Sequence, residues 1–432
     1  MKSNRIVFVT GLALFAMFFG AGNLIIPVMI GVNAGTQSWV SAIGFIASGV
    51  LLPALSMIAL ATKHPEEERF ADRLGAPVGF VLTTIIFLSC GMIYGIPRVG
   101  AVSFEFAAAP IVGNSQLALL AYSAGFFTVA YFLARRPAQM VRNIGTWLTP
   151  ALLALLLALV IASFSLPEVN VEPKDMFVTS PVVGGFIQGY FTMDALAALV
   201  FGGVIVAAFA AAGHKDRQLQ RSTALAGVFA GMLLTIVYLG LIRVGLVGTG
   251  SNGAAVISGV AHGAFGKAGQ MLFGAIVVLA CLTTTLGLIA AFVHYFHTLV
   301  PQISAHSWLL MCVGVSFALA NLGLERILAV VAPLNQLLYP MVICLVLVAL
   351  LDAIMPLELY WSYRVSAWIA GFLAVFEALY STGFEMFESL RIFLDVFPMG
   401  YLQMAWVAPA LAGLVIGLIL DVFFKKPVLI EA

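Results

Sequence analysis

The segment from Phe18 to Asn23 places two glycines and an asparagine inside an apolar stretch that runs from Ile6 to Ile30, and Pro27 follows closely. An apolar stretch of this length can span a membrane, where loose backbone groups find no water, so an interruption is costly unless it has a use. A helix that stops and restarts there offers carbonyl oxygens at one broken end and free N–H groups at the other. The first end suits a cation and the second suits a carboxylate, a pairing that secondary transporters of small anionic or zwitterionic solutes use.

If this helix unwinds near Gly20, the N–H groups of Ala21, Gly22 and Asn23 begin the second half-helix. The alternative interpretation is that the glycines only allow close helix packing, as small-xxx-small motifs do. However, Gly20 and Gly22 lie two residues apart rather than four, and close packing gives no reason for Asn23. The pattern therefore favours a functional break.

A second candidate break is the run Gly-Tyr-Phe-Thr-Met-Asp at residues 189–194, which contains Tyr190 and Asp194. An aspartate inside a membrane span is expensive and indicates function by default. Alternatively, Asp194 caps the second half of a broken helix, and both interpretations can hold together. The small side chains of Ala195, Ala197 and Ala198 leave room for the side chain of a ligand.

Three neighbouring hydroxyl groups, those of Thr283, Thr284 and Thr285, lie in a later apolar stretch. Such oxygens can coordinate a hard cation of sodium size. The alternative is that the threonines bond back to carbonyls of their own helix, which is common in membrane spans. Taken alone, the threonines favour back-bonding, and only opposite a broken helix do they favour a cation site.

Tyr94, Arg98 and Glu105 add polar groups to the third apolar stretch. The seven-residue spacing places Arg98 and Glu105 on one helix face two turns apart, so each is expected to find a nearer partner than the other. Asp194 is a candidate partner for Arg98. The alternatives of a buried ion pair that fixes helix register and of direct contact with a substrate both stay open.

The composition indicates the environment in which these groups act. The chain of 432 residues is 62% hydrophobic and 9% charged, with a mean hydropathy of +1.10, whereas soluble domains carry about 25% charged residues. A net charge of +1 excludes the basic field that nucleic acid requires. Four cysteines lie inside apolar runs, and His294 and His297 are predicted to be interfacial, so no disulfide framework or metal centre is expected.

These observations predict an all-α polytopic membrane protein whose single transmembrane domain covers residues 1–432. The third and eighth predicted spans are long enough to be strongly tilted. Twelve stretches are long and apolar enough to span a membrane, at about residues 6–31, 38–62, 78–110, 116–134, 139–164, 183–212, 221–247, 267–300, 306–322, 326–351, 363–381 and 400–424.

The distribution of positive charge predicts the orientation. If the N-terminus is inside, the inner side receives Lys2, Arg5, Lys63, Arg69, Arg73, Arg135, Arg136, Arg142, Lys215, Arg217, Arg221, Arg364, Lys425 and Lys426. The outer side receives only Lys174, Arg243, Lys267, Arg326 and Arg391. The positive-inside rule therefore places both termini in the cytoplasm.

Short sequence echoes indicate an internal repeat. The Phe-Gly-Ala run at 19–21 is echoed by Phe-Gly-Gly at 201–203, and Leu-Ser-Cys at 88–90 by Leu-Ala-Cys at 279–281. Residues 6–164 and 183–351 are therefore predicted to be two copies of a five-helix unit, with additional helices at 363–424. Because each copy has an odd number of spans, the second is inverted relative to the first.

Three segments carry a family resemblance: residues 14–27, 96–105 and 189–202. They resemble the signature segments of the bacterial branched-chain amino acid:cation symporters, the carrier II family. The resemblance implies uptake of leucine, isoleucine and valine driven by sodium or protons. It also implies membership of the amino acid–polyamine–cation superfamily, with a leucine-transporter-type five-plus-five inverted repeat in which helices one and six are broken.

The resemblance also implies site residues. The sodium ion nearest the scaffold would be held by the carbonyls of Ala16 and Phe19, the carbonyl of Ala280 and the hydroxyls of Thr283 and Thr284. With the polar groups described above, the predicted substrate-binding residues are Gly20, Ala21, Gly22, Asn23, Tyr94, Arg98, Tyr190, Asp194 and Ala198.

The sequence thus predicts a bacterial inner-membrane symporter that imports branched-chain amino acids with Na⁺ by alternating access. No cofactor, no nucleic acid and no enzymatic activity are expected, and the partners are the amino acid, the coupling cation and membrane lipid. The alternative is a proton-coupled carrier of the same or another small neutral amino acid, in which Asp194 or Glu105 would carry the proton. A channel would need rings of polar residues along a pore, and an intramembrane enzyme would need a nucleophile–base pair. Neither pattern is found in the sequence, so both alternatives are disfavoured.

Overall fold

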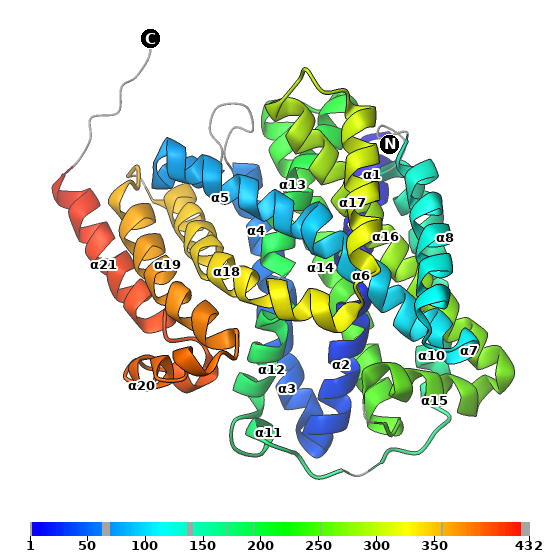
Figure 1. Ribbon diagram of the computed structural model, residues 1–432. Coiled ribbons are helices and arrows are strands. Elements are labelled where there is room, and N and C mark those ends of the chain that lie inside the picture. The colour runs from blue at the N-terminus through cyan, green and yellow to red at the C-terminus, as the bar shows by residue number, and fades with distance from the viewer. Residues whose placement is uncertain are drawn as a thin grey trace. The chain divides into compact units, whose positions relative to one another are not determined.

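Helices are the only regular secondary structure in the part of the chain that the computed structural model describes, residues 2–62, 70–135, 141–169, 171–192, 194–250, 252–355 and 357–424 (Figure 1). The chain divides into two compact units, described separately below. The first contains residues 1–57 and 90–327, and the second contains residues 58–89 and 328–432. The sequence predicts one transmembrane domain over residues 1–432, and the structure divides these residues into two compact units.

The first unit contains most of the helices. Its helices are α1 (Lys2–Phe18), α2 (Ala21–Ala34), α3 (Ser38–Ile46), α6 (Gly95–Ser103), α7 (Ala109–Val112), α8 (Gln116–Ala134), α10 (Thr149–Ser163), α11 (Met176–Thr179), α12 (Pro181–Tyr190), α13 (Asp194–Ala211), α14 (Asp216–Val247), α15 (Gly253–Phe265), α16 (Lys267–Leu299) and α17 (Ala305–Ala320).

The second unit contains α5 (Ala76–Leu88), α19 (Trp361–Ser381), α20 (Leu390–Leu394) and α21 (Val407–Phe423). The chain passes from one unit into the other within α4 (Leu52–Thr62) and within α18 (Leu324–Ile354). Single π-helical turns extend several helices, at Ala47–Leu51, Ser89–Ile93, Phe104–Ala108 and Ile144–Leu148. Short 3₁₀ turns occur at Gly35–Gln37, Phe70–Leu74, Glu385–Phe387 and Gly400–Leu402.

By length and composition, eight helical stretches among the described residues could cross a membrane: Gly22–Ala61, Ala76–Val112, Gln116–Ala134, Val141–Ser163, Asp194–Ala211, Asp216–Val247, Lys267–Leu299 and Gln336–Ile354. Four shorter apolar helices accompany them, at Arg5–Phe18, Gly253–Phe265, Ala305–Ala320 and Val407–Phe423. The prediction of an all-helical polytopic protein is therefore confirmed at the level of fold class.

Helix α15 was not among the predicted elements, because it lies in the connection between the predicted spans at 221–247 and 267–300. It begins where Asn252 Oδ1 accepts a hydrogen bond from the N–H of Ala255 at 2.8 Å and ends at Gly266, whose φ of +59° suits glycine. Its 13 residues measure about 20 Å, which is too short for a hydrocarbon core of about 30 Å. A criterion based on the length of apolar stretches therefore does not identify α15 as a membrane span.

The third predicted span is interrupted rather than one long tilted helix. Gly91 has a non-helical backbone (φ −84°, ψ −123°), and Tyr94 lies just outside the start of α6. Pro97 then occupies the first turn of α6, where a missing N–H costs no intrahelical bond. The eighth predicted span is the continuous 33-residue helix α16.

Helix α1 forms the centre of the first unit. Every residue from Thr10 to Gly20 is buried, so this helix is surrounded on all sides. It contacts α14, α16 and α13, and α2 packs along α14. A Cβ atom added to Gly31 would meet the backbone of α14 at Ile242 and Gly245, so a glycine is needed where α2 and α14 touch.

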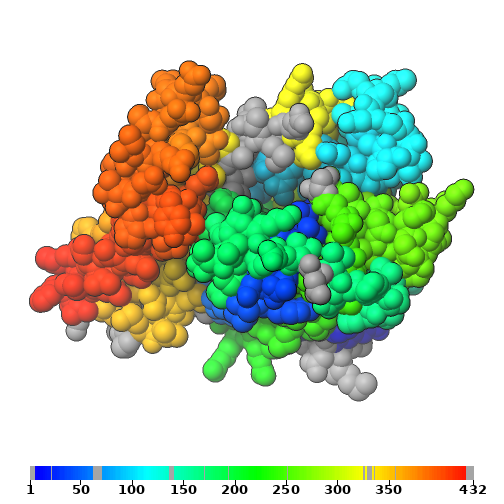
Figure 2. All heavy atoms as spheres, turned by 90° about the horizontal axis from the view of Figure 1, so that it is seen from below, coloured from blue at the N-terminus to red at the C-terminus, as the bar shows by residue number. Residues whose placement is uncertain are grey.

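Helices α3 and α12 approach each other through small residues as well. A Cβ atom on Gly185 would collide with the carbonyl of Ser41, and Ser48 Oγ donates a hydrogen bond to the carbonyl of Phe186. In Figure 2 the chain around the α2–α3 connection, in blue, is bordered by the green segment that leads into α11 and α12. This contact fixes the position at which α12 ends.

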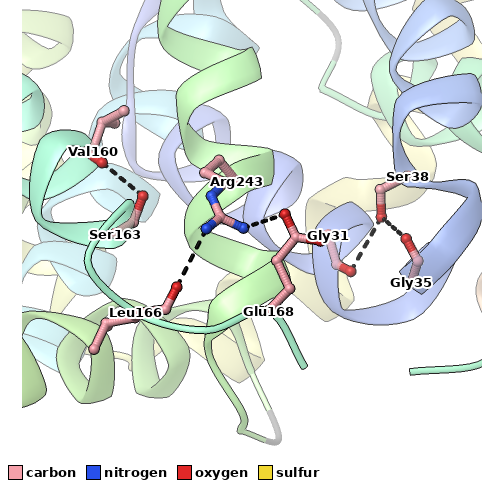
Figure 3. A network of polar contacts seen from close by, with 8 residues as sticks. All are labelled: Gly31, Gly35, Ser38, Val160, Ser163, Leu166, Glu168 and Arg243. Carbon is pink, nitrogen blue, oxygen red and sulfur yellow. Dashed lines mark hydrogen bonds and ion pairs between the residues drawn. The ribbon is translucent and has the colours of Figure 1, made fainter. Parts of the chain in front are cut away.

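The connection between α10 and α11 is bound to the ends of α14 and α2, and we call its residues 164–169 and 171–175 the strap. Arg243 of α14 pairs with Glu168 and donates to the carbonyl of Leu166 at 3.3 Å (Figure 3). Its guanidinium also lies 5.3 Å over the ring of Phe164. The N–H of Lys174 donates to the carbonyl of Asn33 at 2.9 Å. The strap thus joins the C-terminal ends of α14 and α2.

In the second unit, α19 packs along α21. Asp421, near the end of α21, accepts hydrogen bonds from the N–H groups of Tyr360, Trp361 and Ser362 and from Ser362 Oγ. Glu377 of α19 is buried and accepts a hydrogen bond from the N–H of Ala405 at 2.6 Å. Carboxylates of these helices therefore satisfy backbone groups that lipid could not.

Candidate functional site

The helical path is interrupted between α1 and α2 at a fully buried position. Helix α1 ends at Phe18, Gly20 is extended (φ −89°, ψ −176°), and α2 begins at Ala21. The N–H groups of Ala21, Gly22 and Asn23 fall in the first turn of α2, where a helix offers no acceptor. A Cβ atom on Gly20 would lie 3.2 Å from Thr284 Oγ1, which explains the glycine by close approach of α16.

Asn23 connects the two sides of this break to a second helix. Its amide Nδ2 donates to the carbonyl of Phe18 at 2.8 Å and to Asp194 Oδ2 at 2.7 Å. Asn23 and Asp194 are both 5% exposed. Close helix packing gave no reason for Asn23, but these contacts do: its amide satisfies the last carbonyl of α1 and links α2 to α13.

The second interruption lies between α12 and α13. Helix α12 ends at Tyr190, and Asp194 is in the first turn of α13. Thr192 Oγ1 donates to the carbonyl of Gly189 at 2.7 Å and so satisfies the end of α12. The carboxylate of Asp194 is favourable at a helix N-terminus, so it serves this helix end and the contact with Asn23 together.

Arg98 lies at the start of α2 rather than in an ion pair with Asp194. Its Nη1 donates to the hydroxyl of Tyr94 at 2.9 Å, and a Cβ atom on Gly22 would lie 3.5 Å from its Nη2. Arg98 hydrogen-bonds to Tyr94, whereas the carboxylate of Asp194 accepts hydrogen bonds from Asn23 and Thr192. Glu105, on the same predicted face, is exposed.

The threonine hydroxyls lie against the first half of the broken helix. Thr283 Oγ1 is 2.9 Å from the carbonyl of Ala16 and 3.0 Å from that of Ala280, and Thr284 Oγ1 is 3.4 Å from the carbonyl of Ala16. The bond to Ala280 is the back-bonding that the sequence allowed, whereas the contacts with Ala16 join distant helices. Four of the five predicted cation ligands are thus brought together, while Phe19 lies at the break with its ring 5.5 Å from that of Phe15.

The remaining predicted site residues lie in the same unit. Tyr190 is buried with its ring 5.4 Å from that of Phe191, and Ala198 is fully buried on α13. Phe18 and Phe201 meet edge to face at 5.5 Å, so aromatic side chains flank the two interruptions.

Tyr238 of α14 was missed by the sequence analysis. It is fully buried between the rings of Phe19, at 6.2 Å, and Phe45, at 5.1 Å. Its hydroxyl lies near Asn23 and Asp194 but makes no hydrogen bond within the described part of the chain. A tyrosine in an apolar stretch is a weak signal, because aromatic residues are also common where helices meet the membrane surface.

A helical bundle with two helices interrupted at buried positions is typical of secondary transporters. The fold is similar to that of Mhp1, a nucleobase-cation-symport-1 family transporter in a closed conformation, with a TM-score of 0.59 over 99% of this chain and 94% of that chain at 13% identity. An inward-facing conformation of Mhp1 is also similar, with a TM-score of 0.52 over 96% and 91% of the two chains at 14% identity. The fold and the site define a multi-pass membrane transport protein.

The chain belongs to the family described as "Branched-chain amino acid transport protein", which it matches over residues 3–424. It is 37% identical to the branched-chain amino acid permease BrnQ of Corynebacterium glutamicum, covering 97% of this chain and 96% of the relative. It is 34% identical to the permease BraB of Bacillus subtilis, over 96% and 95%, and 32% identical to BrnQ of Escherichia coli, over 97% and 96%. The resemblance found in the sequence is thus confirmed, and the protein is a transporter and not an enzyme.

Proposed function

We propose that this protein is a secondary symporter that imports leucine, isoleucine and valine together with Na⁺ by alternating access. The class of substrate follows from the family, whose characterised members are named branched-chain amino acid permeases. The observation that carries the proposal is the hydrogen bond from Asn23 to Asp194, 2.7 Å long, which joins the two helix interruptions. Helix N-termini with free N–H groups and helix C-termini with free carbonyls therefore meet in one buried region.

The two ends of an amino acid match the two sides of the α1–α2 break. Its carboxylate would meet the N–H groups at the start of α2 and the guanidinium of Arg98, since both favour an anion. Its ammonium would lie toward the carbonyls that end α1 and toward the carboxylate of Asp194. The position of Arg98 Nη2 near Gly22 supports this direction of binding.

The substrate side chain would lie against the small, buried residues at the start of α13. Ala195 and Ala198 are both fully buried. Each methylene of an aliphatic side chain gains about 0.8 kcal/mol from burial, and one methylene more or less discriminates only by about 10- to 200-fold. Leucine, isoleucine and valine should therefore compete with one another, whereas lysine, aspartate and glycine should compete poorly.

Sodium is favoured as the coupling ion by the neutral oxygens around Thr283 and Thr284. Sodium keeps its charge and needs several oxygen ligands, whereas a proton would require a titratable group. The contacts of both threonines with the carbonyl of Ala16 support a cation position between α1 and α16. A proton-coupled carrier that uses Asp194 is the alternative.

For the arrangement in the membrane, we infer twelve spans with both termini in the cytoplasm of a bacterial cell. Residues 6–164 and 183–351 would form the two inverted five-helix repeats, with the helices of residues 363–424 added to them. The odd number of spans in each repeat and the excess of Lys and Arg on one side support this arrangement.

The test is uptake of radiolabelled leucine into proteoliposomes with a sodium gradient or a proton gradient imposed separately. We expect uptake above that of protein-free liposomes only when the sodium gradient points inward. Uptake that ignores sodium and collapses when the proton gradient is dissipated would contradict sodium coupling. Absence of leucine uptake under either gradient, in protein that melts cooperatively, would contradict the proposed substrate.

A further inference from the structure

We propose that Tyr238 is a substrate-contacting residue whose hydroxyl binds the ammonium group of the amino acid. This inference rests on the proposed function, because it assigns one more contact to the same site. Tyr238 lies on α14, a helix that contains none of the motifs identified in the sequence. Tyr238 is one of the largest fully buried side chains among the described residues.

The hydroxyl of Tyr238 lacks the partner that a buried polar group requires. It is enclosed by protein, yet no donor or acceptor of the described residues bonds to it. A buried hydroxyl without a hydrogen bond is destabilising relative to phenylalanine at the same place. A ligand that supplies the missing partner explains why a tyrosine is present.

The direction of the hydroxyl is fixed by packing. The Tyr238 ring meets the ring of Phe45 edge to face, with an interplanar angle of 67°, and lies against Phe19 at the α1–α2 break. The backbone around Gly245 lies too close to Gly31 for a side chain to intervene, so α14 is held tightly against α2. The hydroxyl therefore stays beside Asn23 and Asp194.

The neighbours of this hydroxyl select a cationic group. The Nδ2 group of Asn23 already donates to Phe18 and to Asp194. A phenol oxygen can accept one hydrogen bond while its own hydrogen is donated elsewhere. An ammonium group has three N–H donors, so it can bind the Asp194 carboxylate and the Tyr238 oxygen together. The carboxylate of the same amino acid then points toward Arg98 and the start of α2.

The experiment compares Tyr238→Phe with wild-type protein, using Tyr339→Phe as the matched control. Both variants remove one hydroxyl and keep a fully buried ring, and Tyr339 is a residue of α18 to which no contact with the substrate is assigned. We expect Tyr238→Phe to bind leucine at least tenfold more weakly, since a hydrogen bond to a charged group is lost. Leucine binding by Tyr339→Phe should match the wild-type value, and the melting temperature of Tyr238→Phe without ligand should equal or exceed the wild-type value.

Two analogues assign the contact to one end of the substrate. 4-Methylpentanoate lacks the amino group of leucine and should bind equally to wild-type and Tyr238→Phe protein. Leucinamide keeps the ammonium and should show the same loss as leucine. An equal loss for 4-methylpentanoate and leucine, or a shift in apparent sodium affinity with leucine affinity intact, would overturn the assignment to the ammonium.

If neither analogue binds measurably, the difference in leucine affinity between wild-type protein and Tyr238→Phe tests the proposal. A loss of less than threefold in Tyr238→Phe would then overturn the proposal, and a loss of tenfold or more would support it. Failure of the wild-type protein to bind leucine would instead contradict the proposed function. The two failures are therefore distinguishable.

Discussion

Asn23 donates two hydrogen bonds from its side-chain amide. Its amide satisfies the carbonyl of Phe18 at the end of α1, and it binds the carboxylate of Asp194 at the start of α13. In a membrane, where water is not available to either group, both contacts are needed for the two helices to be interrupted at all. The residue that joins the two helix interruptions thus also makes the break between α1 and α2 stable.

Gly22 leaves open the space in front of the first N–H groups of α2. Replacing it with leucine should abolish leucine binding, by 100-fold or more, because the added side chain would occupy the space near Arg98 that the substrate carboxylate needs. The fold should survive, since the Cβ atom itself meets only Arg98 Nη2, at 3.5 Å. Binding and melting temperature of the purified variant are the measurements.

Gly203→Leu is the control for this substitution, because a Cβ atom at Gly203 of α13 has nothing within 4 Å. It should bind leucine as the wild-type protein does. Wild-type affinity in Gly22→Leu would show that the substrate carboxylate lies elsewhere.

Thr283 and Thr284 allow a test of the cation position. Changing both to alanine should weaken the apparent sodium affinity for transport about 100-fold or more, because two ion–dipole contacts are lost and each is comparable to a hydrogen bond to a charged group, about 1.5–3 kcal/mol. Selectivity among leucine, isoleucine and valine should not change. The sodium dependence of leucine uptake measures the first effect, and competition by the three amino acids measures the second.

Thr298→Ala provides the matched control, since Thr298 also lies on α16, is exposed, and donates its hydroxyl to the carbonyl of His294 on its own helix at 2.9 Å. Its sodium dependence should be unchanged. An unchanged sodium dependence in the double variant would remove the cation site proposed between α1 and α16.

The contact between α3 and α12 shows how whole helices position the site. Gly185→Ala should destabilise the protein by about 1–3 kcal/mol, because the new Cβ atom meets the Ser41 carbonyl and one helix must move. The melting temperature in detergent measures this effect. Gly203→Ala is the control, and equal melting temperatures of the two variants would mean that α3 and α12 can separate without cost.

The lengths of most helices could be predicted from hydropathy, because a membrane span must be both long and apolar. The interruption at Gly20 could be predicted too, since glycine and asparagine at that depth have no other use. Helix α15 could not, because it is too short to span, and the pairing of Asn23 with Asp194 joins residues 171 positions apart, which no local pattern encodes. Tyr238 was missed because its neighbours, Phe19 at the α1–α2 break and Phe45 on α3, are distant from it in the sequence.

The molecule as a whole should have a single orientation in the membrane. The excess of Lys and Arg on the predicted inner side predicts a cytoplasmic C-terminus and a connection after α14 that lies outside. A fluorescent protein fused to the C-terminus should therefore be fluorescent. Alkaline phosphatase fused after Gly250 should be active. The reverse pattern would contradict the orientation, and two reporters on the same side of the membrane would contradict the span count.

The contact of Asp421 with the start of α19 has a consequence for how the chain is made. During translation α19 leaves the ribosome well before Asp421, so the N–H groups at its start lack their acceptor until α21 is made. A helix end without an acceptor for its first N–H groups is less stable than a capped one. The newborn chain therefore cannot finish this helix pair until its last residues are synthesised, and Asp421→Ala should leave full-length protein that cellular proteases degrade faster than wild-type, as a pulse-chase measurement would detect.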